Sequence, residues 1–248
     1  MKAALSHQPV PELAYDISDL VDHRYFYDKR DPELGDYVGY YTCGLSRDTV
    51  AKMLLASHVH FADKDFLRSL PNYINNPSVC GFMIEQAVLS SIALNGLNIT
   101  PETNHPMEVN LFDRRIPDLR HQTENPVLHV PHIFNFPAID GIIARKESGS
   151  NGGKVRLFIF ALQITVAKEH ADSHEKFFEK WKDWIAALDD FDVVPNFVWI
   201  SEHGGKTERH RKCPQWPAHV EWNIQLSRVN DEIGRFYKSV KRNQGIRG

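Results

Sequence analysis

The chain has 248 residues, of which 42% are hydrophobic and 25% are charged. That length can form one large domain, or a domain with an appended helical lobe. The formal net charge of -3 excludes a uniformly basic nucleic-acid-binding protein, although it is compatible with a local basic cleft. The 3 cysteines, Cys43, Cys80 and Cys213, form no disulfide framework, which favours a reducing compartment.

The sequence shows neither a signal-like N-terminus nor a membrane-spanning stretch. No apolar run approaches the roughly 18 residues of a membrane span, and residues 1–16 lack the apolar region of a signal peptide. We therefore expect an intracellular protein, in the cytoplasm or the nucleus, with no membrane partner.

Residues 1–72 are expected to form an N-terminal arm and a helical extension. Up to about Gly44 the sequence is rich in Pro, Tyr and Asp, which indicates an irregular arm with short extended pieces. The apolar spacing then predicts a helix that begins near Ser46 and another over 63–70. Residues 73–248 are expected to form an α/β domain that makes one compact unit with the extension.

A buried helix is predicted from Asn76, which can act as its N-cap, to about Leu94. Glu85 lies one helical step from Phe82 and Leu89, so its carboxylate faces the interior with an apolar face. A buried carboxylate needs a partner. Two interpretations are open: an ion pair with an arginine, or a role in a metal or catalytic site.

The next clear element is an extended segment over 130–143, preceded by one short possible strand over 108–112. This segment carries Asp140 among isoleucines, directly before Gly141. An aspartate is out of place in a core strand. It is either part of a hairpin turn, which Asp-Gly favours, or part of a functional site.

The run over 155–167 is almost entirely apolar and rich in Val, Ile and Phe, which predicts a central strand buried on both faces. Residues 148–154 supply a flexible hairpin connection into it. Because side chains alternate along a strand, Gln163 and Thr165 lie on the same face. A buried amide without a partner costs about 1–3 kcal/mol, so Gln163 belongs to a hydrogen-bond network or to a site.

After the central strand, an aromatic stripe predicts a helix over 173–188, and 196–201 predicts a strand parallel to the central one through a right-handed crossover. A basic, histidine-containing loop over 203–219 precedes a short strand or turn and a terminal helix. The expected fold is α/β, with a mixed central sheet flanked by helices. Core packing is the expected role of Trp181, Trp184 and Trp199.

The order of Glu85 on a helix, Asp140 on the second strand of a hairpin pair and Gln163 with Thr165 on the next strand resembles the PD-(D/E)xK restriction-endonuclease-like superfamily. The likeness is to the variant core of Crinkler-type and retrotransposon-hot-spot-type proteins, and NNPSVCGFMIEQAVLSSI and LQITVAKEH are the most similar stretches. It implies a restriction-endonuclease-like core with an acid on the first helix, an acid on the second strand and an acid-x-Lys triplet on the third. The corresponding residues here are Glu85, Asp140 and Gln163-Ile164-Thr165.

The resemblance implies metal-dependent cleavage of nucleic acid, DNA more than RNA, by a host-directed effector or a mobile-element-linked toxin. Such domains often follow an NTPase module, for which this chain has no Walker-type sequence. Cleavage of this kind requires Mg²⁺ or Mn²⁺ held by oxygen ligands. Asp140 is the expected anionic ligand, Glu85 binds directly or through water, and the Gln163 and Ile164 carbonyl groups complete the shell.

Two departures from the motif leave an alternative open. Gln163 replaces the acid, which loosens metal binding, and Thr165 replaces the lysine, whose charge a hydroxyl cannot supply. Lys168 is the best substitute for that lysine, ahead of Lys154 and Arg156 at the far end of the strand. The alternative is an inactive nuclease-fold module that binds nucleic acid or a protein partner, and a third possibility is an unrelated α/β protein with structural polar groups.

Basic residues near the C-terminus can supply phosphate contacts around a central site, or form ordinary solvated surface. The expected nucleic-acid-binding residues are His170, Lys206, Arg209, Arg211 and Lys212.

Two groups of histidines allow other interpretations. His170 and His174 are four residues apart, as metal-binding pairs are, and the alternatives are a capping or phosphate-contacting His170 and a solvated His174. The spacing of a second group fits no standard zinc module. That group is His203, His210, Cys213 and His219.

Overall fold

The computed structural model of the chain describes residues 26–30, 37–41, 77–112, 116–131, 138–148, 153–165, 173–202, 207–213 and 215–245. The chain divides into two compact units, Met1–Val59 with His132–Phe134 and His60–Pro131 with Asn135–Gly248. In the first unit, β1 (Phe26–Arg30) and β2 (Tyr37–Tyr41) pair antiparallel, which confirms the expected short extended pieces. The helices predicted near Ser46 and over 63–70 lie outside the described residues.

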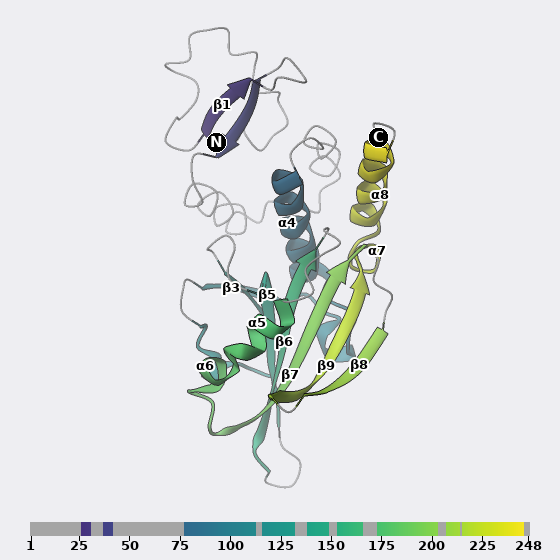
Figure 1. Cartoon of the computed structure of the whole chain (residues 1–248). Coiled ribbons are helices and arrows are strands. Elements are labelled where there is room, and N and C mark those ends of the chain that lie inside the picture. Colours follow the sequence, from purple (N-terminus) through teal and green to yellow (C-terminus); the bar gives the residue numbers. More distant parts are fainter. Residues whose placement is uncertain are drawn as a thin grey trace. The chain divides into compact units, whose positions relative to one another are not determined.

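The second unit contains a seven-stranded mixed sheet with the order β3-β4-β5-β6-β7-β9-β8 (Figure 1). Its parallel pairs are β3 with β4, β6 with β7 and β7 with β9, and the other neighbours are antiparallel. The predicted α/β class with a mixed central sheet is confirmed. The strands are β3 (Glu108–Phe112), β4 (Val127–Pro131), β5 (Gly141–Glu147), β6 (Val155–Thr165), β7 (Phe191–Ser201), β8 (Thr207–Cys213) and β9 (Trp216–Gln225).

The central position of β6 follows from its apolar sequence. Its middle residues, among them Leu157, Ile159 and Ala161, are fully buried, because neighbouring strands and helices cover both faces. The predicted hairpin with β5 and the predicted parallel crossover to β7 are both confirmed. The described helices are α4 (Pro77–Asn95), α5 (Ser173–Glu179), α6 (Trp181–Ile185), α7 (Leu226–Val229) and α8 (Asp231–Gly245), with the short 3-10 helices η2 (Pro101–Thr103) and η3 (Leu119–His121).

Different helices cover the two faces of the sheet (Figure 1). On the face that we call the α5 face, aromatic residues of α5 and α6 pack on Ile142 of β5, Ala161 of β6 and Phe197 of β7. On the opposite face, the α4 face, the space above Gly141 is filled by Leu89 of α4. The polar link between α4 and the α7–α8 corner is a hydrogen bond of 2.9 Å from Asn230 Nδ2 to Ser91 Oγ.

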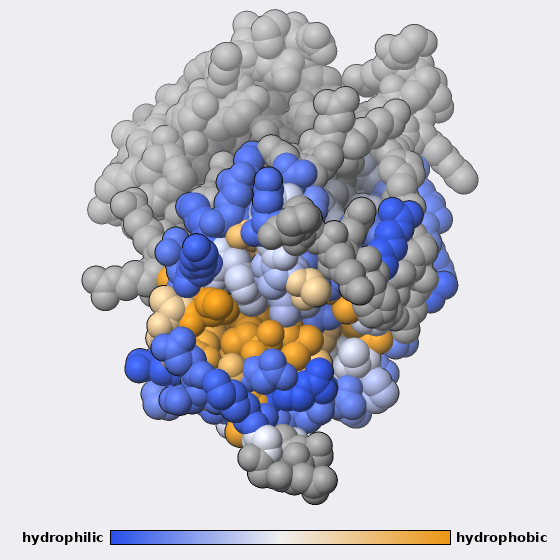
Figure 2. Space-filling view, turned by 60° about the horizontal axis from the view of Figure 1, so that its bottom comes forward, coloured by the Kyte–Doolittle hydropathy of each residue, from blue (hydrophilic) through white to orange (hydrophobic). Residues whose placement is uncertain are grey.

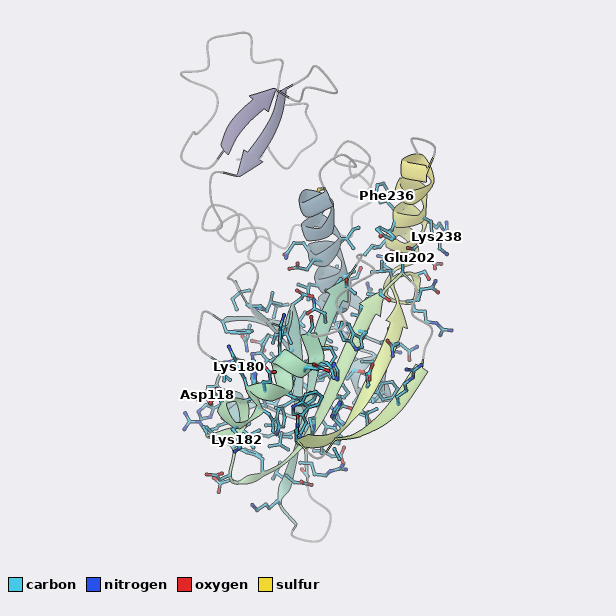
Figure 3. All side chains as sticks on the ribbon, in the orientation of Figure 1. Asp118, Lys180, Lys182, Glu202, Phe236 and Lys238 are labelled. Carbon is cyan, nitrogen blue, oxygen red and sulfur yellow. The ribbon has the colours of Figure 1, made fainter. Side chains whose placement is uncertain are left out.

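The helix predicted over 173–188 is interrupted at Lys180. This residue leaves the helical conformation, with φ -95° and ψ 11°, and separates α5 from α6. The break lets the aromatic residues on either side, among them Phe177 and Trp184, stay buried in one cluster against the sheet. Lys180 and Lys182 are exposed (Figure 3).

Two further predictions need correction. Residues 203–219 do not form a loop throughout, because β8 pairs antiparallel with β9 inside this range. The basic residues of β8 do not have the apolar pattern that indicates a strand. Charged residues are nevertheless common on edge strands, because they prevent the edge from pairing with another chain. The extended segment predicted over 130–143 is also interrupted: β4 ends at Pro131, Ala138 has a φ of +73°, and β5 begins only at Gly141.

Part of the surface near the start of the central strands is hydrophobic. In the view of the end where β6 and β7 begin, hydrophobic residues gather in one central area with hydrophilic residues around it (Figure 2). Val155, the first residue of β6, is 37% exposed. The polar residues Gln163 and Thr165 lie at the other end of β6.

No helix in the described part of the chain is long and apolar enough to cross a membrane.

Gly141 is predicted to be the residue that lets α4 approach the start of β5. A Cβ atom at this position would lie 3.2 Å from Leu89 Cδ2 and 3.4 Å from the His129 backbone oxygen. The larger side chain of Gly141→Val should therefore lower the free energy of unfolding by about 1–3 kcal/mol, as measured by denaturant titration. Gly153→Val, at an exposed position, is the control. Equal effects of the two substitutions would contradict close packing at Gly141.

Candidate functional site

Asp140 and Gln163 lie opposite each other on the α5 face. The pairing of Gly141 with Leu162 sets this arrangement, and a backbone hydrogen bond of 2.8 Å from Asp140 N to the Leu162 oxygen extends it. The Gln163 side-chain Nε2 donates to Asp140 Oδ2 at 2.7 Å. The backbone N–H of Ile164 donates to the same oxygen at 2.6 Å. The carboxylate is therefore held in one orientation by two donors from β6.

The position of Asp140 excludes one of the two interpretations of the Asp-Gly pair. Gly141 is the first residue of β5 and pairs with Leu162 inside the sheet, so Asp140 and Gly141 do not form a hairpin turn. The sequence predicted Asp140 within a strand, but Asp140 directly precedes β5.

The Asp140 carboxyl is destabilised in its charged form by its surroundings. The residue is half-buried, and desolvation raises the pKa of its carboxyl from 3.8 to about 7, against the lowering effect of the Ile164 hydrogen bond. A carboxyl with this pKa exchanges its proton near neutral pH. Such strongly perturbed groups concentrate at functional sites, where chemistry or a bound cation uses them.

Glu85 approaches this region from the other side of the sheet. It is half-buried on α4, and its Oε1 accepts a hydrogen bond of 3.2 Å from Gln86 Nε2. Leu89, one helical turn further along, packs against Gly141 on the α4 face. Since Asp140 and Gln163 lie on the α5 face, the three residues predicted as metal ligands belong to both sides of the sheet.

The donor chemistry at Asp140 fits a magnesium ion with few protein ligands. Within the described part of the chain, Gln163 Nε2 and Ile164 N both donate to Oδ2, which makes Oδ1 the candidate oxygen for a cation. The Gln163 amide, whose nitrogen is bonded to Asp140, has its oxygen for a second ligand. Among the described residues, no group of three or more His, Cys, Asp and Glu side chains could hold a metal ion. Magnesium requires no such group, because it commonly keeps several waters and binds one or two carboxylates.

The other residues predicted to act in catalysis are described only in part. Thr165 is half-buried at the last position of β6, where it pairs with Ser201 of β7. Lys168 lies outside the described residues. Arg156 is at the far end of β6, as expected, and its guanidinium forms ion pairs with Glu147 at 3.4 Å and Asp192 at 3.8 Å.

Three of the five predicted nucleic-acid-binding residues belong to the edge strand β8. Arg209 is exposed on this strand, and Arg211 and Lys212 occupy later positions of it. His170 and Lys206 lie outside the described residues. Their contact with nucleic acid stays a prediction.

His174, for which a metal-binding and a solvated role were both open, is partly exposed and contacts aromatic rings. This residue is half-buried at the start of α5, and its ring centroid lies 5.3 Å from that of Trp216 and 6.4 Å from that of Trp199. His219, one of the residues considered for zinc, is buried and stacks on Phe178 at 4.1 Å. Of the remaining residues considered for zinc, His210 and Cys213 are on β8, and His203 lies outside the described residues.

Trp199 is the residue near the site whose position the sequence did not indicate. Trp181 and Trp184 are buried as predicted, whereas Trp199 is only half-buried. It pairs in register with Gln163 across the β6–β7 boundary, so both side chains point to the α5 face. The parallel register depends on how the crossover packs, and no local pattern in the sequence encodes it.

Comparisons of the chain with protein-family models, with curated proteins and with solved structures find no match. The candidate function therefore rests on the residues around Asp140 and on their geometry.

The raised pKa of Asp140 predicts a pH-dependent effect of Asp140→Asn. The folded protein holds the Asp140 proton more tightly than the unfolded chain, so wild type should lose stability as the pH rises from about 4 to about 7. A shift from 3.8 to about 7 corresponds to at most roughly 4 kcal/mol. Asparagine has no such proton and keeps an oxygen for the Ile164 N–H.

Urea unfolding of both proteins at pH 4 and pH 8 measures this effect. Asp140→Asn should be the more stable protein at pH 8, by about 1–4 kcal/mol, with a much smaller difference at pH 4. Asp140→Ala, which leaves the Ile164 N–H without its acceptor, should gain less than Asp140→Asn. A wild type more stable than Asp140→Asn at pH 8 would show that the ionised carboxylate is well compensated.

Proposed function

We propose that this chain is a metal-dependent nuclease that hydrolyses phosphodiester bonds of nucleic acid, DNA more than RNA, with Asp140 as its principal metal ligand. The observation that carries the proposal is the Asp140 carboxyl. It is desolvated, bonded to Gln163 and Ile164, and has a pKa of about 7. Desolvation of an ionised carboxyl costs stability, and binding of a divalent cation would offset that cost. The resemblance in the sequence extends the proposal to an intracellular effector or mobile-element-linked toxin.

The order of the elements supports the same proposal. Helix α4 precedes the antiparallel strands β4, β5 and β6, and the α5–α6 pair then leads to β7, parallel to β6. Strand β3 is an additional strand between α4 and β4. Apart from it, this order agrees with the core that the resemblance implies, in which the first helix is followed by three strands. Asp140 precedes the second of these antiparallel strands, and Gln163 is on the third.

The residues of the chain would contribute orientation and charge. The Ile164 N–H and the Gln163 amide both bond to Oδ2 of Asp140 and so orient its carboxylate. Near neutral pH Asp140 loses its proton readily, because its pKa lies at about 7. A bound Mg²⁺ or Mn²⁺ would polarise the phosphate and lower the pKa of an attacking water. Lys168 would supply the positive charge that Thr165 cannot supply.

The second candidate function is an inactive module of the same fold that binds nucleic acid or a protein partner. Two observations favour it. Gln163 presents its amide nitrogen to Asp140, so part of the carboxylate is already engaged by a neutral donor. Thr165, at the last position of β6, stands where the resemblance implies a lysine.

Nuclease assays distinguish the two candidates. Supercoiled plasmid, linear duplex, single-stranded DNA and RNA should each be incubated with Mg²⁺, Mn²⁺ or EDTA. The nuclease proposal predicts metal-dependent cutting that falls by about 100-fold or more in Asp140→Ala, because a principal ligand is lost. Asp190→Ala, at an exposed position, should cut like wild type. A folded wild type that cuts no substrate with either metal would favour the inactive module.

Gln163→Glu provides a test of the metal site that needs no catalysis. The substitution places a second carboxylate beside Asp140 and removes the amide hydrogen bond, so it should lower the melting temperature in EDTA. Mg²⁺ or Mn²⁺ should raise the melting temperature of Gln163→Glu more than that of wild type, since an added charge tightens the site. Gln163→Leu is the control without a second ligand. Equal metal-dependent shifts in all three proteins would contradict a cation site at Asp140.

A further inference from the structure

Four side chains form a row on the α5 face, one from each of four neighbouring segments of the sheet. Asp140 is hydrogen-bonded to Gln163, Gln163 pairs in register with Trp199, and Trp199 pairs in register with Asn223 of β9. In-register partners on parallel strands point to the same face. All four residues are half-buried. We call this set, Asp140, Gln163, Trp199 and Asn223, the polar row.

The polar row marks the limit of the helical cover on this face. The neighbouring row consists of Ile142, Ala161, Phe197 and Glu221, which are 0%, 0%, 0% and 7% exposed. Aromatic residues of α5 and α6 pack over that row but leave the polar row partly accessible. A single large aromatic ring, that of Trp199, thus lies at a partly open edge between two side-chain amides.

The Trp199 ring contacts two other rings. Its centroid lies 5.0 Å from that of Phe197, which is fully buried, and 6.4 Å from that of His174. These contacts limit the motion of the indole, so a ligand stacked on it would not have to order it first. The arrangement suits a flat ring bound against Trp199.

The spacing of the polar row matches a nucleic-acid strand. Adjacent strands of a sheet lie ~4.8 Å apart, so Trp199 is about 10 Å from Asp140, or about three stacked nucleotides at ~3.4 Å each. The Asn223 amide carries both a donor and an acceptor, which can bond to the edge of a base. On the next strand, β8, Arg209 is exposed and lies in register with Glu221 of the neighbouring row. Its guanidinium can supply positive charge for a phosphate.

We propose that the polar row binds single-stranded nucleic acid, with an unpaired base stacked on Trp199, its edge bonded to Asn223 and a flanking phosphate at Arg209. The inference rests on the proposed function, since it places the strand's phosphate at Asp140. Bases inside a duplex are stacked on one another and cannot reach Trp199 without being flipped out. The substrate class is therefore a single strand, or an unpaired stretch within a longer nucleic acid.

Binding can be measured apart from cleavage, by fluorescence anisotropy of a labelled dT oligonucleotide in EDTA. Wild type should bind the single strand more tightly than the matching duplex. Trp199→Ala should weaken single-strand binding about 5- to 100-fold, the range expected for the loss of one stacked base. Trp199→Phe keeps an aromatic ring and should retain most of the affinity.

Trp222 offers a matched control on the same sheet. It is also half-buried on a strand, but it points to the α4 face, where its Nε1 donates to Asn196 Oδ1 at 3.2 Å. Trp222→Phe should therefore bind like wild type. Quenching of tryptophan fluorescence by the oligonucleotide should disappear in Trp199→Phe and persist in Trp222→Phe. This readout tests the stacking even if Trp199→Ala fails to fold.

The outcomes separate this inference from the nuclease proposal. Duplex binding as tight as single-strand binding, or quenching that survives in Trp199→Phe, would overturn the inference whether or not the protein cuts. Trp199-dependent single-strand binding by a wild type that cuts nothing would support the inference and reject the nuclease proposal. Cutting that needs Asp140 but is unchanged in Trp199→Ala on every substrate would support the nuclease proposal and reject the inference.

Discussion

The register of β5 against β6 is the constraint on which the candidate site depends. With Gly141 opposite Leu162, Asp140 faces Gln163 and meets the Ile164 N–H. A slip of one residue would turn every side chain of β5 to the other face and place Asp140 among the apolar contacts of α4. Ile142 on the α5 face and Gly141 beneath Leu89 fix that register, because neither position tolerates the other's side chain. Core packing thus positions the Asp140 carboxylate.

Desolvation of Asp140 opposes folding, and the surrounding core allows the protein to tolerate it. The two donors from β6 stabilise the ionised form, but the raised pKa shows that they do not fully replace water. A structural role alone would be served better by asparagine, which bonds to the same donors without a charge to desolvate. The choice of a carboxylate at this position therefore favours a role for the charge itself, which the proposed divalent cation at Asp140 would use.

The elements whose formation depends on the pattern of hydrophobic residues were predicted from the sequence. The apolar runs of α4 and β6 identified both elements, and alternation along β6 placed Gln163 and Thr165 together. The predicted hairpin and crossover identified β5 and β7 as the neighbours of β6, because chain connectivity restricts which strands can pair. Predictions failed where tertiary contacts decide. Lys180 interrupts a continuous aromatic stripe, and the charged segment of β8 forms a strand because β9 offers it an open edge.

For the candidate site, the sequence identified Asp140 and Gln163, because polar groups within apolar runs stand out against the cost of burying them. It did not identify Trp199, because a tryptophan in an apolar strand has the same pattern whether it fills the core or borders a site. Only the register that pairs Trp199 with Gln163 separates these roles.

The glutamine at 163, one of the departures from the nuclease motif, affects the charge of the candidate site. With glutamine at 163, Asp140 carries the negative charge of the pair alone, and its pKa of about 7 makes that charge sensitive to pH in the neutral range. Cation affinity at the proposed site would then rise with pH as Asp140 ionises, a dependence that a second permanent carboxylate would alter.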